Sequence, residues 1–69
     1  MKVGDLRRFK EGLTGSARCQ QLRGHTFVVL ETATSETARW VTFLIDGRIE
    51  GGWGGDWVES NSEVIDESR

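Results

Sequence analysis

The fold is decided by residues 40–50, which read Trp-Val-Thr-Phe-Leu-Ile-Asp-Gly-Arg-Ile-Glu. Aromatic and β-branched side chains fill most of the first six positions, as is typical of a β-strand. Asp46-Gly47 supplies the two positive-φ residues that a type I′ turn requires, and Arg48-Ile49-Glu50 then resumes the alternation of polar and apolar residues. The stretch therefore predicts a β-hairpin that turns at residues 46–47.

Three further strands are predicted on the two sides of this hairpin. Residues 3–9 alternate between apolar and polar side chains, residues 25–31 form a β-branched and aromatic run, and residues 62–65 form a last short strand. The chain has nine glycines and no proline, which suits short strands joined by tight turns. Four of those glycines, with two tryptophans, lie in residues 51–57 and predict a sharp bend.

The segments between the strands carry weak helix signals. Residues 10–24 contain three glycines and only two large apolar residues, so we interpret them as a long basic loop. One helical turn can form near residues 16–22, with Ser16 as its N-cap. Asp56 can likewise cap a short turn that ends at Glu59, and residues 66–69 form a polar tail.

The 69 residues therefore predict one domain, spanning residues 1–69, of the all-β class. A small five-stranded antiparallel sheet that leaves long edges exposed invites edge-to-edge pairing, so we expect it to bend strongly and close into an SH3-like barrel. Cys19 is the only cysteine, which excludes an intrachain disulfide framework. No signal-peptide pattern and no apolar run near the ~20 residues of a membrane span is present. We expect a cytoplasmic protein with no membrane partner.

Three stretches of the chain resemble small SH3-like barrel proteins of tailed phages, of the marine cyanophage type. They are the opening MKVGDL (residues 1–6), the segment VTFLIDG (residues 41–47) and the ending SEVIDESR (residues 62–69). The resemblance implies the barrel fold and a viral setting in a host cytoplasm, and it carries no specific function. The more distantly related Sm-like barrels bind RNA as rings, but their glycine-rich signature is not visible here.

The supply of reactive side chains argues against catalysis. The chain has one histidine, one cysteine and no tyrosine, whereas an active site needs several convergent groups. A pairing of Cys19 with His25 is conceivable, but free cysteines are usually inert. We therefore predict no catalytic site, no metal site, no cofactor and no enzymatic activity.

An interaction surface is the better prediction. The strand at residues 40–45 is apolar on both alternating faces, and a single barrel covers only one of them. We expect either the loop at residues 10–24 or another subunit to cover the other. The leading prediction is a non-enzymatic interaction module that acts through self-association or a protein partner. Of the three tryptophans, Trp53 or Trp57, beside the glycines, is expected to be the exposed one. The predicted interface residues are Trp40, Thr42, Leu44, Trp53 and Trp57.

The uneven distribution of charge along the chain allows two other hypotheses. Residues 1–24 carry six basic and two acidic side chains, a balance of +4, whereas residues 25–69 carry three basic and nine acidic ones, a balance of −6. Basic and acidic edges of neighbouring copies can thus meet head to tail in a ring. Alternatively, the domain binds RNA or single-stranded DNA as an Sm-like oligomer, with an exposed tryptophan as a stacking platform. The basic residues predicted for that role are Arg7, Arg8, Lys10, Arg18 and Arg23.

Overall fold

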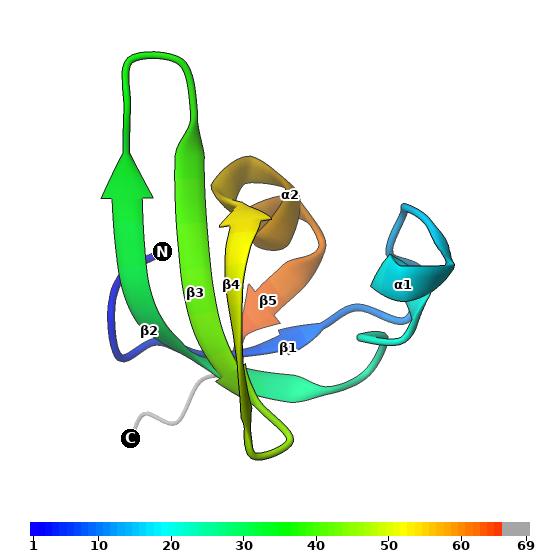
Figure 1. The fold of residues 1–69 in the computed structure, drawn as a ribbon. Coiled ribbons are helices and arrows are strands. Elements are labelled where there is room, and N and C mark those ends of the chain that lie inside the picture. The colour runs from blue at the N-terminus through cyan, green and yellow to red at the C-terminus, as the bar shows by residue number, and fades with distance from the viewer. Residues whose placement is uncertain (66–69) are drawn as a thin grey trace.

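The structure, a computed structural model, describes residues 1–65 and consists of five strands and two short helices (Figure 1). The predicted polar tail at residues 66–69 lies outside the described residues. In chain order the elements are β1 (Leu6–Phe9), α1 (Ala17–Gln20), β2 (Thr26–Thr34), β3 (Arg39–Ile45), β4 (Arg48–Gly54), α2 (Gly55–Ser60) and β5 (Ser62–Val64).

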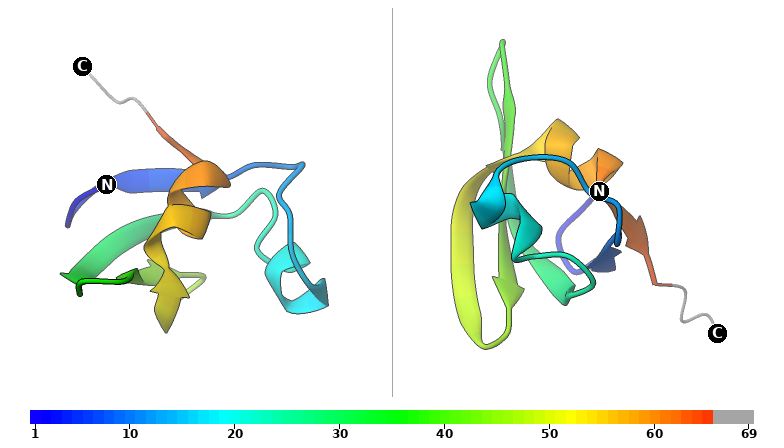
Figure 2. Two further views of the ribbon diagram at one scale, coloured as in Figure 1. Left: turned by 90° about the horizontal axis from the view of Figure 1, so that it is seen from above. Right: turned by 90° about the vertical axis from the view of Figure 1, so that its right-hand side faces the viewer.

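The strands form one antiparallel sheet in the order β4-β3-β2-β1-β5. This confirms the all-β class and the five-stranded antiparallel sheet. The sheet is bent, and both helices lie on its concave side (Figure 2). Closure into a barrel stays a prediction, because the strand pairs within residues 1–65 leave β4 and β5 as two separate edges.

The hairpin at residues 40–50 forms as predicted. Asp46 and Gly47 both have positive φ, 52° and 76°, as a type I′ turn requires. The two-residue turn fixes the register of β3 and β4, in which Ile45 faces Arg48 and Leu44 faces Ile49.

Three strand boundaries differ from the sequence-based prediction by more than one residue. β4 continues past Glu50 to Gly54, so the first part of the glycine-rich stretch predicted to bend is strand. β1 starts at Leu6 and not at Val3, because residues 2–5 form a tight turn in which the Lys2 backbone N–H donates to Asp5 Oδ2 over 2.9 Å. β2 continues past residue 31, because residues 32–34 pair with β3 as far as Arg39. The resulting long hairpin extends beyond the other strands in Figure 1.

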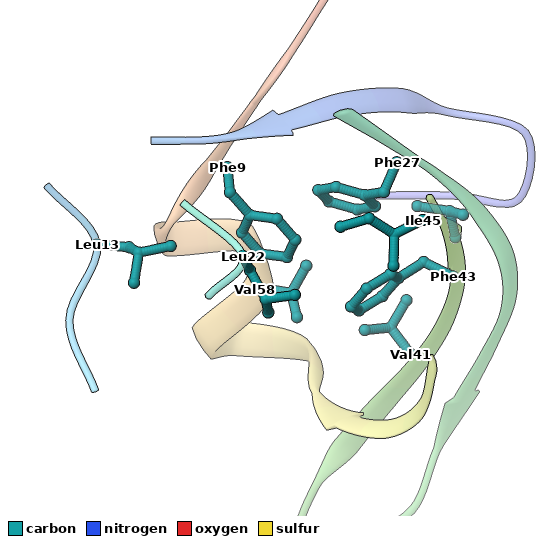
Figure 3. Packing of buried hydrophobic residues seen from close by; sticks show 9 residues of the cluster. Phe9, Leu13, Leu22, Phe27, Val41, Phe43, Ile45 and Val58 are labelled. Carbon is teal, nitrogen blue, oxygen red and sulfur yellow. The ribbon is translucent and has the colours of Figure 1, made fainter. Parts of the chain in front are cut away.

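Three phenylalanines form the centre of the core (Figure 3). The ring of Phe9 stacks on Phe27 at a centroid distance of 4.4 Å, and Phe43 lies 4.8 Å from Phe27. Leu13 and Leu22, the two large apolar residues of the loop at residues 10–24, are buried against them. That loop is therefore part of the core.

Of the two predicted helix caps, Ser16 is confirmed in position and Asp56 is wrong. Ser16 stands at the N-cap of α1 but makes no side-chain capping hydrogen bond, and its hydroxyl contacts Cys19 Sγ instead. α2 begins at Gly55 with Gly54 as its N-cap, so Asp56 lies in the first turn, where it binds Arg39. Arg39 also binds Glu59 over 2.9 Å and thereby fastens the start of β3 to α2.

Candidate interaction surface

The outer face of β3 brings together three of the predicted interface residues. Val41, Phe43 and Ile45 are buried in the core, so the alternating residues Trp40, Thr42 and Leu44 lie on the opposite face. Trp40 is 48% exposed and Leu44 is 39% exposed. β3 is the second strand of the sheet, between β4 and β2, and Trp40 lies near its start, where the β2–β3 hairpin extends beyond the other strands.

Leu44 is the centre of an apolar row across the sheet. In the strand register it faces Val28 on β2 and Ile49 on β4. Val28 in turn faces Leu6 on β1. Ile49 is 68% exposed, so this row is open to solvent at its β4 end.

Trp40 is exposed because its neighbours are small. It faces Ala33 on β2 and Gly54 on β4, and neither can cover an indole ring. The next outward residue, Thr42, faces Glu31 and lies against Gly51, where an added Cβ would be 3.4 Å from the threonine hydroxyl. We call this area the β3 surface and define it as Trp40, Thr42 and Leu44 with the flanking residues Val28, Ala33, Ile49 and Gly54.

The β3 surface carries no charged side chain, and the charges around it are few. Glu31 lies beside Thr42. On β1, Arg8 points to the same outer face, but its guanidinium pairs with Glu63 on β5 over 3.3 Å. Glu31 is therefore the charge that lies nearest to the middle of this face.

The other two tryptophans lie on the concave side, which corrects our prediction of the exposed one. Trp53 and Trp57 are half-buried against the core and stack on each other at 5.5 Å with an angle of 28° between their planes. The indole N–H of Trp57 donates to the Thr14 carbonyl over 3.1 Å. Trp40, not Trp53 or Trp57, is the most exposed tryptophan.

Trp53 also lines an open hollow of about 340 Å³ between β4 and the loop that carries α1. Glu50 joins its polar side chains: the carboxylate accepts hydrogen bonds from Arg48 Nε over 2.9 Å, and from Arg18 Nη2 and Trp53 Nε1 over 3.3 Å each. The Arg48 guanidinium, followed by the Trp53 N–H, holds the pKa of Glu50 below its ordinary value. We call this site the Arg–Trp hollow, lined by Arg18, Gln21, Leu22, Arg48, Glu50 and Trp53.

The five basic residues predicted to contact phosphates do not act as one set. Arg7 is buried, and its guanidinium donates to the Ser62 hydroxyl and to the Ser62 and Glu59 carbonyls. That prediction is wrong for Arg7, because these bonds fix the side chain inside the domain. Arg8 is paired on the outer face, whereas Arg18 lies at the Arg–Trp hollow. Lys10 and Arg23 are exposed.

The basic and acidic parts of the sequence meet within one chain. Arg8 pairs with Glu63, and Arg18 pairs with Glu50. Two of the six cations of residues 1–24 thus pair with acidic side chains of the same molecule, and the buried Arg7 is held by neutral oxygens. The charge difference between residues 1–24 and residues 25–69 is thus partly neutralised by ion pairs within one molecule.

Cys19 and His25 have separate surroundings. Cys19 is half-buried beside Ser16, and His25 Nδ1 lies 3.0 Å from Asp46 Oδ2. Within residues 1–65, no three histidine, cysteine or acidic side chains cluster as metal ligands would. Neither described helix has the length or the apolar character to cross a lipid bilayer.

Sequence reasoning missed Val28 and Ile49 as parts of the β3 surface. The Asp46-Gly47 turn was a usable signal for Ile49, since a two-residue turn places residue 49 opposite residue 44. Val28 gave no such signal, because its register with β3 depends on the loop at residues 35–38 and on an irregularity between Val29 and Glu31.

No protein-family model, no curated protein and no solved structure matches this chain. The resemblance to SH3-like phage proteins therefore stays a prediction. The function is inferred from the geometry of the structure alone.

Proposed function

We propose that this domain is a non-enzymatic interaction module with an SH3-like barrel fold, and that it self-associates through the β3 surface. The observation that carries the proposal is the exposure of Trp40 and Leu44 on the outer face of one strand. Water-exposed aromatic and aliphatic side chains grouped on one face are typical of protein interfaces, whose energetic centres are enriched in tryptophan.

The charge of the surface favours a second copy as the occupant. The residues that define the β3 surface are uncharged, so their contact with a second copy is not repulsive, and the Glu31 beside Thr42 is the charge that such a contact must keep in water. Sheet faces of this kind pack on each other about 10 Å apart in β-sandwiches. The expected occupant is thus a second β3 surface, with each Trp40 lying on the apolar row of its partner.

The size of the molecule is sufficient for such a contact. A stable interface buries about 800 Å² on each partner, and the chain exposes 4372 Å² in all. The molecule measures 33 × 31 × 21 Å, so such an interface would occupy most of one broad face.

The position of α2 supports the barrel part of the proposal. This helix follows β4 directly, precedes β5 and contacts both of these edge strands as well as β3. It therefore covers the opening between the two edges on the concave side (Figure 2). An edge that is covered in this way is protected from pairing with another chain, which leaves the outer face for contacts.

Light scattering on a size-exclusion column tests self-association. We expect the wild-type chain to elute as a dimer or larger oligomer that persists at high salt, because an apolar contact is little screened. Trp40→Ser and Leu44→Glu should each raise the dissociation constant at least about tenfold. Both side chains lie outside the core, so the thermal transition should be retained.

Val3→Ser is the control, since Val3 is an apolar residue outside the β3 surface that is even more exposed, at 61%. It should leave the oligomeric state unchanged. A wild-type chain that stays monomeric up to about 1 mM would exclude self-association of functional strength.

A further inference from the structure

The Arg–Trp hollow lies on the concave side of the sheet, away from the β3 surface. Glu50 faces Phe43 in the register of β3 and β4, and Trp53 faces Val41, both of which belong to the core. A ligand in the Arg–Trp hollow would therefore bind independently of self-association through the β3 surface. Two arginines and one glutamate give the site a balance of +1.

Both arginines keep unused hydrogen-bond donors. A guanidinium carries five N–H groups, and within residues 1–65 Arg18 and Arg48 each donate once, to Glu50. Their side chains are 73% and 53% exposed. Glu50 thus holds the two cations side by side and leaves their outer N–H groups for the oxygens of an anion.

Trp53 adds an aromatic wall to these cations. The Arg18 guanidinium carbon lies over its ring at 5.5 Å from the centroid. An exposed contact of this kind is weaker than the stacking of a nucleobase on an aromatic side chain. A planar base can therefore replace Arg18 on the indole, and the released guanidinium remains close enough to pair with a phosphate of the same ligand.

We propose that the Arg–Trp hollow binds a nucleotide, with the base on Trp53 and the phosphate on Arg18 and Arg48. The volume of about 340 Å³ is at the lower end of small-molecule sites, which suits one nucleotide and not a dinucleotide. The same chemistry is offered by a free nucleotide and by one unit of a single-stranded nucleic acid. An acidic peptide would use the arginines but not the aromatic wall.

The test is a titration of the ¹⁵N-labelled full chain, monitored by the three indole N–H signals in NMR spectra. Adenosine 5′-monophosphate should shift the Trp53 signal, because that N–H donates to Glu50 at the site. The Trp40 signal should not move. Adenosine and inorganic phosphate, each carrying half of the ligand, should bind at least about tenfold more weakly.

Substitution of the two exposed arginines tests which side chains bind the phosphate. Arg18→Gln and Arg48→Gln should each weaken the binding of the mononucleotide about fivefold or more, without loss of the folded spectrum. Arg8→Gln removes an arginine from the outer face and is the matched control, which should bind like the wild type. Trp53→Phe, which keeps a ring against Phe43 and Trp57, should weaken binding while phosphate alone is unaffected.

Comparison with a hexa-adenylate separates the two sources of the ligand. A hexamer that binds more than about tenfold tighter than the mononucleotide indicates a single strand, and equal affinities indicate a free nucleotide. The proposal is overturned if the mononucleotide leaves the Trp53 signal unchanged. It is also overturned if phosphate binds as well as the mononucleotide, or if a hexaglutamate peptide binds more tightly than either adenylate.

Discussion

Arg7 Nε donates a hydrogen bond of 2.8 Å to the hydroxyl of Ser62, which lies 55 residues further along the chain in the interior of the domain. The same guanidinium donates to the Ser62 carbonyl over 3.1 Å and to the Glu59 carbonyl over 3.3 Å. One buried side chain on β1 therefore holds the end of α2 and the start of β5.

Arg7→Met should destabilise the domain, because Met fills the space without satisfying the buried oxygens. Hydrogen bonds from a charged donor contribute about 1.5–3 kcal/mol each, and they overlap here, so we expect a loss of about 2–4 kcal/mol. Urea unfolding measures this loss in the free energy of unfolding. Arg8→Met, next to it but exposed, should change the free energy of unfolding by less than about 1 kcal/mol. Equal effects would show that burial of Arg7 is unimportant.

Phe43→Ala should cost about 3–5 kcal/mol, because it opens a cavity beside Phe27 and Phe9. In a domain of 69 residues this loss is enough to unfold the chain. Leu44→Ala, one position along the same strand but on the outer face, should leave a cooperative thermal transition. A folded, cooperative Phe43→Ala variant would contradict the placement of Phe43 in the core.

Gly47→Ala should destabilise the hairpin by about 1–2 kcal/mol, because an L-residue is strained at a φ of 76°. The change exposes no new surface, so chemical denaturation should show a lower midpoint with an unchanged slope. Gly12 lies in open space without a positive φ, so Gly12→Ala is the control and should be neutral or slightly stabilising.

Acid should destabilise the domain through Glu50 and Glu59. Hydrogen bonds from Arg48 and Arg39 respectively hold the pKa of each carboxyl below its ordinary value of 4.5. A carboxyl whose pKa is lowered by folding stabilises the native state above its unfolded pKa, and this contribution is lost as the pH falls through its folded pKa. The free energy of unfolding should therefore decline below about pH 4.5.

Glu50→Gln should be less stable than the wild type at neutral pH, and the difference should shrink as the pH falls, when the wild-type carboxyl is protonated as well. Urea unfolding between neutral pH and about pH 3 measures both curves. Glu36→Gln, in the exposed loop between β2 and β3, is the control and should keep the wild-type curve. If the free energies of unfolding of Glu50→Gln and the wild type changed with pH in parallel, groups other than Glu50 would be responsible for the acid sensitivity.

Local patterns were sufficient to predict the hairpin at residues 40–50, since the turn type and the alternation are encoded within eleven consecutive residues. They also placed Trp40 and Leu44 on the face opposite Phe43, because strand side chains alternate. The length of β2 was not predictable in this way. Its polar residues 32–34 form a strand only because β3 provides partners for their backbone groups.

The remaining errors concern contacts between distant segments. Arginine is rarely buried, so nothing in the sequence distinguished Arg7 from Arg8. The exposure of each tryptophan depends on the size of residues on neighbouring strands, such as Ala33 and Gly54 beside Trp40. The Arg–Trp hollow requires the loop of residues 10–24 to fold against β4, which brings Arg18 to Glu50 across 32 positions of sequence.

The pairing of β1 with β5 makes the first strand depend on the last. During synthesis, Leu6–Phe9 emerges from the ribosome long before Ser62–Val64, its neighbour at the sheet edge. Until then one edge of β1 is open, and the Arg7 guanidinium lacks the acceptors that permit its burial. The native sheet can therefore be completed only after residue 64 has left the ribosomal exit tunnel, and until then Arg7 must stay in water.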